Sequence, residues 1–162
     1  MEKKEHNQTQ RNGTIHFILL HSYFIFLSAV ILGVFFDTFL SYKLFTNPLY
    51  QTLGLLLIIL GSLIIYWAQK TSGSYHPEKA KLKNRTYFDR GPYKYLRSPT
   101  HFGLFIMTLG LALILSSLFS IIFTILAHIF TKVYFLRKEE SLLEIKYGEI
   151  YREYKRKVKN WI

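Results

Sequence analysis

The chain has 162 residues, of which 50% are hydrophobic and 17% aromatic, and it carries a formal net charge of +11. This length predicts a single domain spanning residues 1–162, and the apolar content excludes a disordered chain. The sequence contains no cysteine, which excludes disulfides, thiolate metal sites and iron–sulfur clusters. Apart from Lys43, lysine and arginine fall into three blocks, and the 34 residues 98–131 carry no charge. A nucleic-acid-binding domain would expose that apolar stretch to water. We therefore interpret the basic blocks as flanks of membrane helices and expect no nucleic-acid partner.

Four apolar segments predict an all-α, integral membrane helical bundle. After a tail at 1–14, we expect the first two spans at about 15–36 and 48–68, each near the ~20 residues that cross a bilayer core. Residues 102–136 are too long for one crossing, because a helix of that length extends about 52 Å. The polar pair Ser116-Ser117 is the natural point of reversal. It divides the stretch into a C-terminal helical hairpin with spans at about 99–115 and 118–137.

The distribution of basic residues predicts the topology of the four spans. The N-terminal block has three lysines and arginines, the 70–100 loop eight and the C-terminal block nine, whereas the first connecting loop has only Lys43. The positive-inside rule therefore predicts a multi-pass protein with both termini cytoplasmic. Residues 138–162 predict a cytoplasmic amphipathic helix, since apolar and aromatic residues recur at three- and four-residue steps, with a bend at Gly148.

Residues at the start of the third span are suited to binding an anionic group. Pro99 fits the first turn of that helix, and Ser98 fits the N-cap position before it. A helix N-terminus beside Arg97 favours a carboxylate or phosphate, although a proline-started helix with a snorkelling arginine explains the same residues. His101 lies about one turn inside the third span. It is either a functional group at membrane depth or a hydrogen-bonded histidine in the interior of the bundle.

Adjacent carboxylates follow the fourth span. Glu139 and Glu140 point about 100° apart on a helix, so only one readily faces the bundle, and a solvated charge cluster is the alternative. A two-residue turn places the start of the third span beside the end of the fourth. We therefore expect Arg97 and His101 to meet residues 137–140 at one cytoplasmic mouth that suits a zwitterionic, positively charged ligand. The remaining histidines lack metal-ligand spacing, and we expect no metal.

The motifs around this mouth resemble a known enzyme family. Gly91-Pro92-Tyr93, Arg97 and Ser98-Pro99-Thr100-His101-Phe102-Gly103 resemble the GPYxxxRHPxYxG signature of the isoprenylcysteine carboxyl methyltransferase family. The ending Glu139-Glu140-Ser141-Leu142-Leu143, with Tyr147-Gly148, Tyr151, Tyr154 and Val158, is similar to the family's EExxL…FGxxYxxYxxxV. The resemblance covers about residues 85–158, and the wider superfamily includes phospholipid N-methyltransferases and membrane sterol reductases.

The resemblance implies an S-adenosylmethionine-dependent methyltransferase that acts on a lipophilic acceptor in the bilayer, by carboxyl O-methylation or headgroup N-methylation. With Arg97 added for its place at the helix terminus, the implied cofactor contacts are Arg85, Tyr87, Phe88, Tyr93, Arg97, Ser98, Pro99, Thr100, His101 and Glu139. The family's histidine is Ser98 here and its tyrosine is His101, so the imidazole has moved by about one helical turn. It either replaces the lost group in part or marks a remodelled cofactor site. A substrate-contacting arginine of the eukaryotic enzymes aligns with Phe135, which makes Arg137 the local candidate.

The acceptor and two rival functions stay open at this point. A carboxylate acceptor is already anionic at pH 7, whereas an ammonium acceptor must lose a proton to a base such as His101 or Glu140. We thus take Arg137, Glu140 and His101 as the catalytic candidates. The rivals are a non-enzymatic basic membrane protein that binds anionic lipid or a partner, and a nicotinamide-dependent membrane reductase of the same superfamily. The short chain and the paired motifs favour the methyltransferase.

Overall fold

The computed structural model describes residues 2–40, 47–73 and 90–158, with the side chains of residues 2–19 and of Lys146 excepted. Regular structure in these ranges is entirely helical. The long elements are α1 (Glu2–Leu40), α2 (Pro48–Gly73), α4 (Pro99–Ile114) and α5 (Leu118–Phe130). The short ones are the 3₁₀ helix η2 (Gly91–Lys94), the π-helical turn η3 (Thr131–Leu136), α6 (Arg137–Tyr147) and α7 (Glu149–Lys157).

The helices form an integral membrane bundle, as predicted. Within the described ranges, three helical stretches are long and apolar enough to cross a membrane, Leu20–Leu40, Pro48–Ser72 and Leu118–Ile145, and α4 is a shorter apolar helix. Large apolar side chains on the outer surface, such as Phe24, Leu63 and Ile129, are more than half exposed. Such a surface is stable against lipid tails and costly in water.

Two helices extend farther than the sequence analysis predicts. The first helix begins at Glu2 rather than near residue 15, so the segment expected as a tail continues the helix. The helix of the fourth span does not end at Arg137, since η3 and α6 continue it to Tyr147. Residues 118–147 contain neither proline nor glycine, so no helix-ending residue separates α5 from α6, whereas α1 continues through Gly13 without a break.

The predicted helical hairpin is present, with its reversal at Ser116 and Ser117. Ser116 has a φ of 52°, and the Ser117 hydroxyl caps α5 by accepting the backbone N–H of Ser120 at 3.0 Å. Ser117 also donates to the Asp37 carboxylate, and the Ser120 hydroxyl donates to the Val30 carbonyl at 3.1 Å. These bonds attach the tip of the hairpin to α1.

Glycines bring α2 and α4 into backbone contact. A Cβ atom built on Gly61 would lie 2.6 Å from the carbonyl oxygen of Gly103, and one on Gly110 would lie 2.5 Å from that of Gly54. Both distances are shorter than any real Cβ contact, so each position requires glycine. Small residues at a helix interface let membrane helices pack closely without a hydrophobic driving force.

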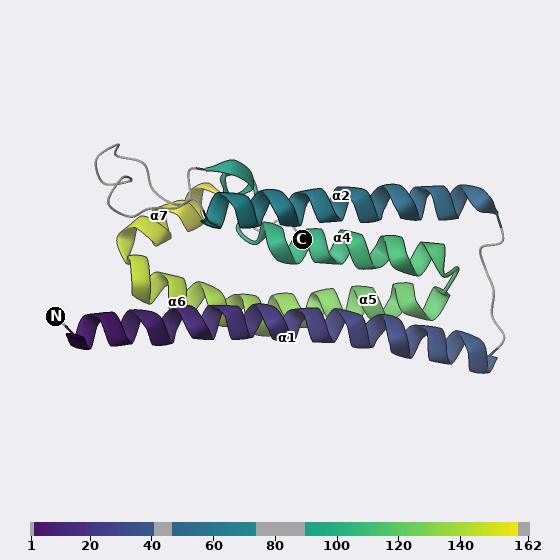
Figure 1. The fold of residues 1–162 in the computed structure, drawn as a ribbon, viewed down its shortest axis with the longest axis horizontal. Helices are drawn as coiled ribbons and strands as arrows, with labels where there is room; N and C mark the ends of the chain where they lie inside the picture. The colour runs from purple at the N-terminus through teal and green to yellow at the C-terminus, as the bar shows by residue number, and fades with distance from the viewer. Residues whose placement is uncertain (1, 41–46, 74–89, 159–162) are drawn as a thin grey trace.

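The polar elements gather at one end of the bundle. The N-terminus, η2, α6 and α7 lie at that end, and the turn between α4 and α5 lies at the other (Figure 1). Gly148 ends α6 with a φ of 59°, so the predicted amphipathic helix is two helices with the expected bend. The Tyr154 hydroxyl of α7 donates to the Tyr93 carbonyl of η2 at 2.6 Å, and α7 thereby closes over this end.

Candidate active site

An ion-pair cluster joins three segments at the polar end of the bundle. Arg97 precedes α4, and its Nη1 lies 2.8 Å from Oε1 of Glu140 on α6; each side chain is 13% exposed. The Lys155 ammonium of α7 lies 3.0 Å from the other Glu140 oxygen and 2.9 Å from Glu144. The predicted meeting of Arg97 with residues 137–140 is therefore present in the structure. We call this cluster of Arg97, Glu140, Glu144 and Lys155 the mouth.

Glu139 points away from the mouth toward the buried His101. Its Oε2 lies 3.9 Å from Nδ1 of His101, and Nε2 of the same ring lies 3.1 Å from the hydroxyl of Ser22 on α1. When Nδ1 carries the proton and faces the carboxylate, Nε2 accepts the Ser22 hydroxyl proton. Ser22 is fully buried, and the sequence analysis does not identify it. A single serine in an apolar span has no spacing that marks it as a partner of a histidine 79 residues away.

Several charged atoms at this end are buried without a hydrogen bond. They include Nε and Nη1 of Arg97, Oε2 of Glu139 and Oε1 of Glu140, as judged over the described part of the chain. Arg97 and Glu140 are thus at ion-pair distance without the angle of a hydrogen bond. Buried polar groups are nearly always hydrogen-bonded in native proteins, because an unpaired one is costly. Open donors and acceptors of opposite charge fit a ligand that has both an anionic and a cationic group.

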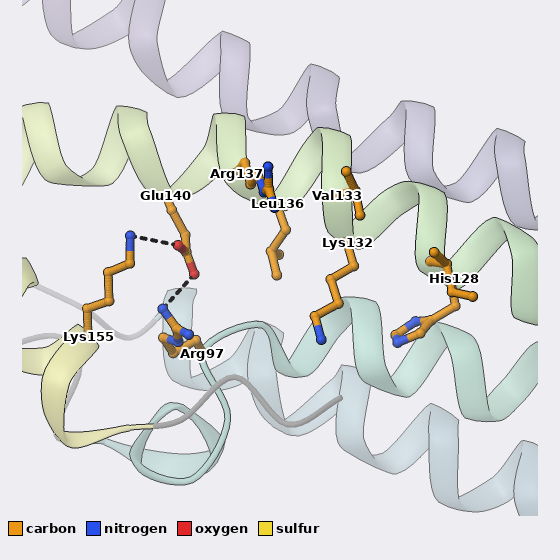
Figure 2. A pocket seen from close by; sticks show the side chains of 9 residues that line it. Arg97, His128, Lys132, Val133, Leu136, Arg137, Glu140 and Lys155 are labelled. Atoms are coloured by element: carbon orange, nitrogen blue, oxygen red, sulfur yellow. Dashed lines mark ion pairs between the residues drawn. The ribbon is translucent and has the colours of Figure 1, made fainter.

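A cavity of about 550 Å³ runs from the mouth along the inner side of α5, η3 and α6 (Figure 2). Lys155 and Glu140 lie at one end of it and His128 at the other (Figure 2). Its complete lining is Arg97, His128, Ile129, Lys132, Val133, Leu136, Arg137, Glu140 and Lys155. Of the residues predicted for the site, it is lined by Arg97, Arg137 and Glu140, whereas His101 and Glu139 are not part of its lining.

A π-helical turn forms part of the cavity wall. Residues 131–136 adopt this geometry between the α-helical segments α5 and α6. Single π turns within α-helices are frequent at functional sites, because the wider turn changes the direction of the side chains that follow. The turn contributes Lys132, Val133 and Leu136 to the cavity. In the sequence, Lys132 counts only toward the C-terminal basic block, since no sequence pattern identifies a π turn.

The remaining predicted residues occupy different positions. Pro99 begins α4, as predicted, and is buried. Ser98 holds the N-cap position, but the predicted side-chain cap is wrong, because its ψ of 67° departs from the extended backbone that presents the hydroxyl to the helix. Thr100 lies half-buried in the first turn, and the backbone carbonyl of Tyr93 anchors α7. Arg85, Tyr87 and Phe88 lie outside the described residues.

Two tyrosines of α7 cover the carboxylates from outside the membrane span. The side chain of Tyr151 is 2% exposed and packs with Tyr154. Burial, together with the negative charges of Glu140 and Glu139, raises the pKa of the Tyr151 hydroxyl. Tyr151 therefore stays neutral at physiological pH and adds a dry aromatic surface beneath the charged cluster.

These features define an integral membrane protein whose charged groups converge at one end of an apolar helical bundle. The phospholipid methyltransferase family model matches residues 49–150, and the chain belongs to this family. The match includes Arg97, Glu140 and Glu144 of the mouth and leaves out Lys155 and α1. The family relates the chain to membrane methyltransferases, in agreement with the resemblance of the motifs. Neither the curated proteins nor the solved structures contain a match to the chain.

Proposed function

We propose that this chain transfers a methyl group from S-adenosylmethionine to a lipophilic acceptor in the membrane. The observation that carries the proposal is a pair of oppositely charged side chains at one end of the hairpin, Arg97 and Glu139, each with buried atoms that lack a hydrogen bond among the described residues. The guanidinium suits the carboxylate of the cofactor, and Glu139 suits its cationic end. When bound, the cofactor supplies a methyl group on a sulfonium.

The chain's own contribution to methyl transfer is alignment and the exclusion of water. An in-line displacement gains most of its rate from holding the nucleophile and the methyl group in register. Glu140 orients Arg97, and Lys155 fixes Glu140 from the opposite side, so that the three side chains restrain one another. The buried Tyr151 and Tyr154 of α7 keep water from this end of the bundle.

The cavity provides a path for an acceptor that arrives from the bilayer. Ile129 and Val133 line it and are also about half exposed on the outer surface of the bundle. An acceptor with an apolar tail can lie against these side chains while its polar group faces Glu140 and Arg137. We assign Glu140 and Arg137 to the acceptor half of the site on this ground.

His101 is the base that an ammonium acceptor requires. Its ring lies between Ser22 and Glu139, so Nε2 can take up the acceptor's proton through the Ser22 hydroxyl while Nδ1 releases its own proton to the Glu139 carboxylate. We expect His101→Ala to abolish transfer to phosphatidylethanolamine and only to weaken transfer to a farnesylated cysteine. Rates of methyl incorporation into the two acceptors measure the difference, and equal losses would contradict a base role.

We further propose that the mouth and both termini are cytoplasmic. The support is the positive-inside distribution of basic residues, together with the position of the N-terminus at the same end as the mouth (Figure 1). The chain has no native cysteine, so single-cysteine variants give an unambiguous readout. A membrane-impermeant thiol reagent should label Lys138→Cys only after cells are opened. It should label Phe39→Cys, which is exposed at the far end, in intact cells.

Incorporation of labelled methyl groups from S-adenosylmethionine into membrane lipids tests the function itself. We expect Arg97→Gln to lower the rate by about 100-fold, as loss of one charge-stabilising donor does in other enzymes. Arg152→Gln is the matched control, because that arginine is 59% exposed and pairs only with Glu149 among the described residues. A wild-type protein that is folded and inactive toward all lipid acceptors would contradict the proposal.

A further inference from the structure

Lys132 is a half-buried lysine of η3, and the carboxylates of the mouth do not form an ion pair with it. It lies eight residues before Glu140 in one continuous helix, roughly 12 Å deeper along the axis. It also lies within the predicted fourth span at about residues 118–137, on the apolar stretch Leu118–Ile145. No carboxylate of the described residues is within ion-pair distance of its ammonium. A lysine at membrane depth is costly and normally faces a partner or a functional cavity.

His128 provides a second open group at the same depth. It lies one helical turn before Lys132, and its Nε2 is buried without a hydrogen-bond partner over the described ranges. Its ring stacks on Phe105 with centroids 4.2 Å apart, which fixes the ring's orientation. Figure 2 shows both side chains reaching from the same helix into the space toward α4, and both line the cavity.

The charge along the cavity is unevenly balanced. At the mouth, Glu140 is matched by Arg97 and Lys155. Deeper in, Lys132 has no acidic residue beside it, because the one carboxylate among the residues that line the cavity is Glu140 at the mouth. The inner end therefore carries net positive charge, and apolar Ile129 and Val133 border it on the side exposed to lipid tails. An anion with an apolar tail satisfies both features.

We propose that the inner end of this cavity binds the phosphate of a membrane lipid, with Lys132 as its charge partner and His128 Nε2 as a second donor. This inference rests on the proposed function, because the bound lipid is then the methyl acceptor. The order of groups agrees with the cavity: the headgroup lies toward the mouth, the phosphate at Lys132, and the chains over Ile129 and Val133. A phosphate offers more charge and more acceptor oxygens than a carboxylate to such a pair of donors.

Binding of dioctanoyl phosphatidic acid to the purified protein in uncharged detergent micelles tests the phosphate site without any methyl transfer. Dioctanoylglycerol is the matched probe, since it has the same tails and no phosphate. We expect Lys132→Gln to weaken phosphatidic acid binding by about tenfold and Lys132→Arg to retain it within about twofold. Lys138→Gln is the control variant, because Lys138 is an exposed lysine of the same helix that does not line the cavity.

Several results would overturn the phosphate site. One is equal weakening by Lys132→Gln and Lys138→Gln, which would show a general surface charge effect. Another is dioctanoylglycerol that binds as tightly as phosphatidic acid. A farnesylated cysteine that displaces phosphatidic acid and depends equally on Lys132 would assign the site to a carboxylate instead. Displacement by inorganic phosphate alone would show that no lipid is required.

Binding of S-adenosylmethionine in the same samples separates the two proposals. Cofactor binding without any binding of phosphatidic acid overturns the phosphate site and leaves the proposed function standing. Lys132-dependent binding of phosphatidic acid without cofactor binding supports the phosphate site and overturns the proposed function. We expect Lys132→Gln to leave the affinity for S-adenosylmethionine unchanged, since Lys132 lies deeper than Arg97 and Glu139.

Discussion

Substitution of Glu140 by glutamine tests whether the mouth is held together by charge. The glutamine keeps the shape of the side chain and removes the negative charge that lies 2.8 Å from Arg97 and 3.0 Å from Lys155. Arg97 is only 13% exposed and then has no counter-charge, whereas Lys155 is 40% exposed and regains water. Breaking a buried pair from one side costs about 3–5 kcal/mol. Because Lys155 is relieved by solvent, we expect the lower end, about 3 kcal/mol in the free energy of unfolding.

Unfolding in mixed micelles of dodecyl maltoside and dodecyl sulfate, followed by circular dichroism, measures this free energy. Glu149→Gln is the matched control, since Glu149 pairs with Arg152 at 3.2 Å and both side chains are about 60% exposed. That change should alter the free energy of unfolding by less than about 0.5 kcal/mol. Replacing Arg97 and Glu140 together by leucine should cost less than Glu140→Gln alone. Equal effects of Glu140→Gln and Glu149→Gln would refute a buried ion pair at the mouth.

Three further predictions concern packing and pH. Gly110→Ala should lower the free energy of unfolding by about 1–3 kcal/mol, because its Cβ would meet the Gly54 carbonyl at 2.5 Å; a neutral result in the same assay would contradict backbone contact between α2 and α4. Gly148→Ala should cost about 1–2 kcal/mol from its φ of 59° alone, as nothing lies within 4 Å, and a stabilised variant would show that the backbone relaxes. Hydrogen bonds to Glu144 and Glu140 raise the pKa of Lys155 above its ordinary 10.5. The stability lost in Lys155→Met should therefore be constant from about pH 7 to 9 and vanish as the pH rises beyond the raised value, and a loss that disappears near neutral pH would contradict this assignment.

The hairpin and the contact between its two ends can be predicted from the sequence, because the long apolar run offers few positions at which the chain could reverse. Ser116-Ser117 is the one polar pair near the middle of a long apolar run, and a reversal there places the start of α4 beside the end of the fourth span. The ion pair between Arg97 and Glu140 is the direct consequence. The helix ends are harder to predict. Both α1 and the helix of the fourth span continue past the apolar residues into polar ones, which form helix in water as readily as apolar residues do in the membrane.

The features that the sequence does not reveal depend on contacts between distant segments. Ser22 becomes important only because α1 packs against α4 and brings its hydroxyl to His101. Lys132 lies near the end of the predicted fourth span and resembles any basic residue at a membrane boundary, and no sequence pattern shows that a π turn brings it into the cavity wall. Ser98 has the residue type of an N-cap, but its backbone conformation prevents the bond.

Direct binding of S-adenosylmethionine to the purified protein in nanodiscs tests the central claim, with Glu139→Ala and Glu149→Ala measured alongside the wild type. We predict saturable binding by the wild type and by Glu149→Ala, whose altered side chain is exposed and pairs with Arg152, and loss of binding by Glu139→Ala. A wild-type protein that is folded and binds neither S-adenosylmethionine nor S-adenosylhomocysteine would contradict the account. The polar end of the bundle would then be a lipid- or partner-binding site that carries out no chemistry.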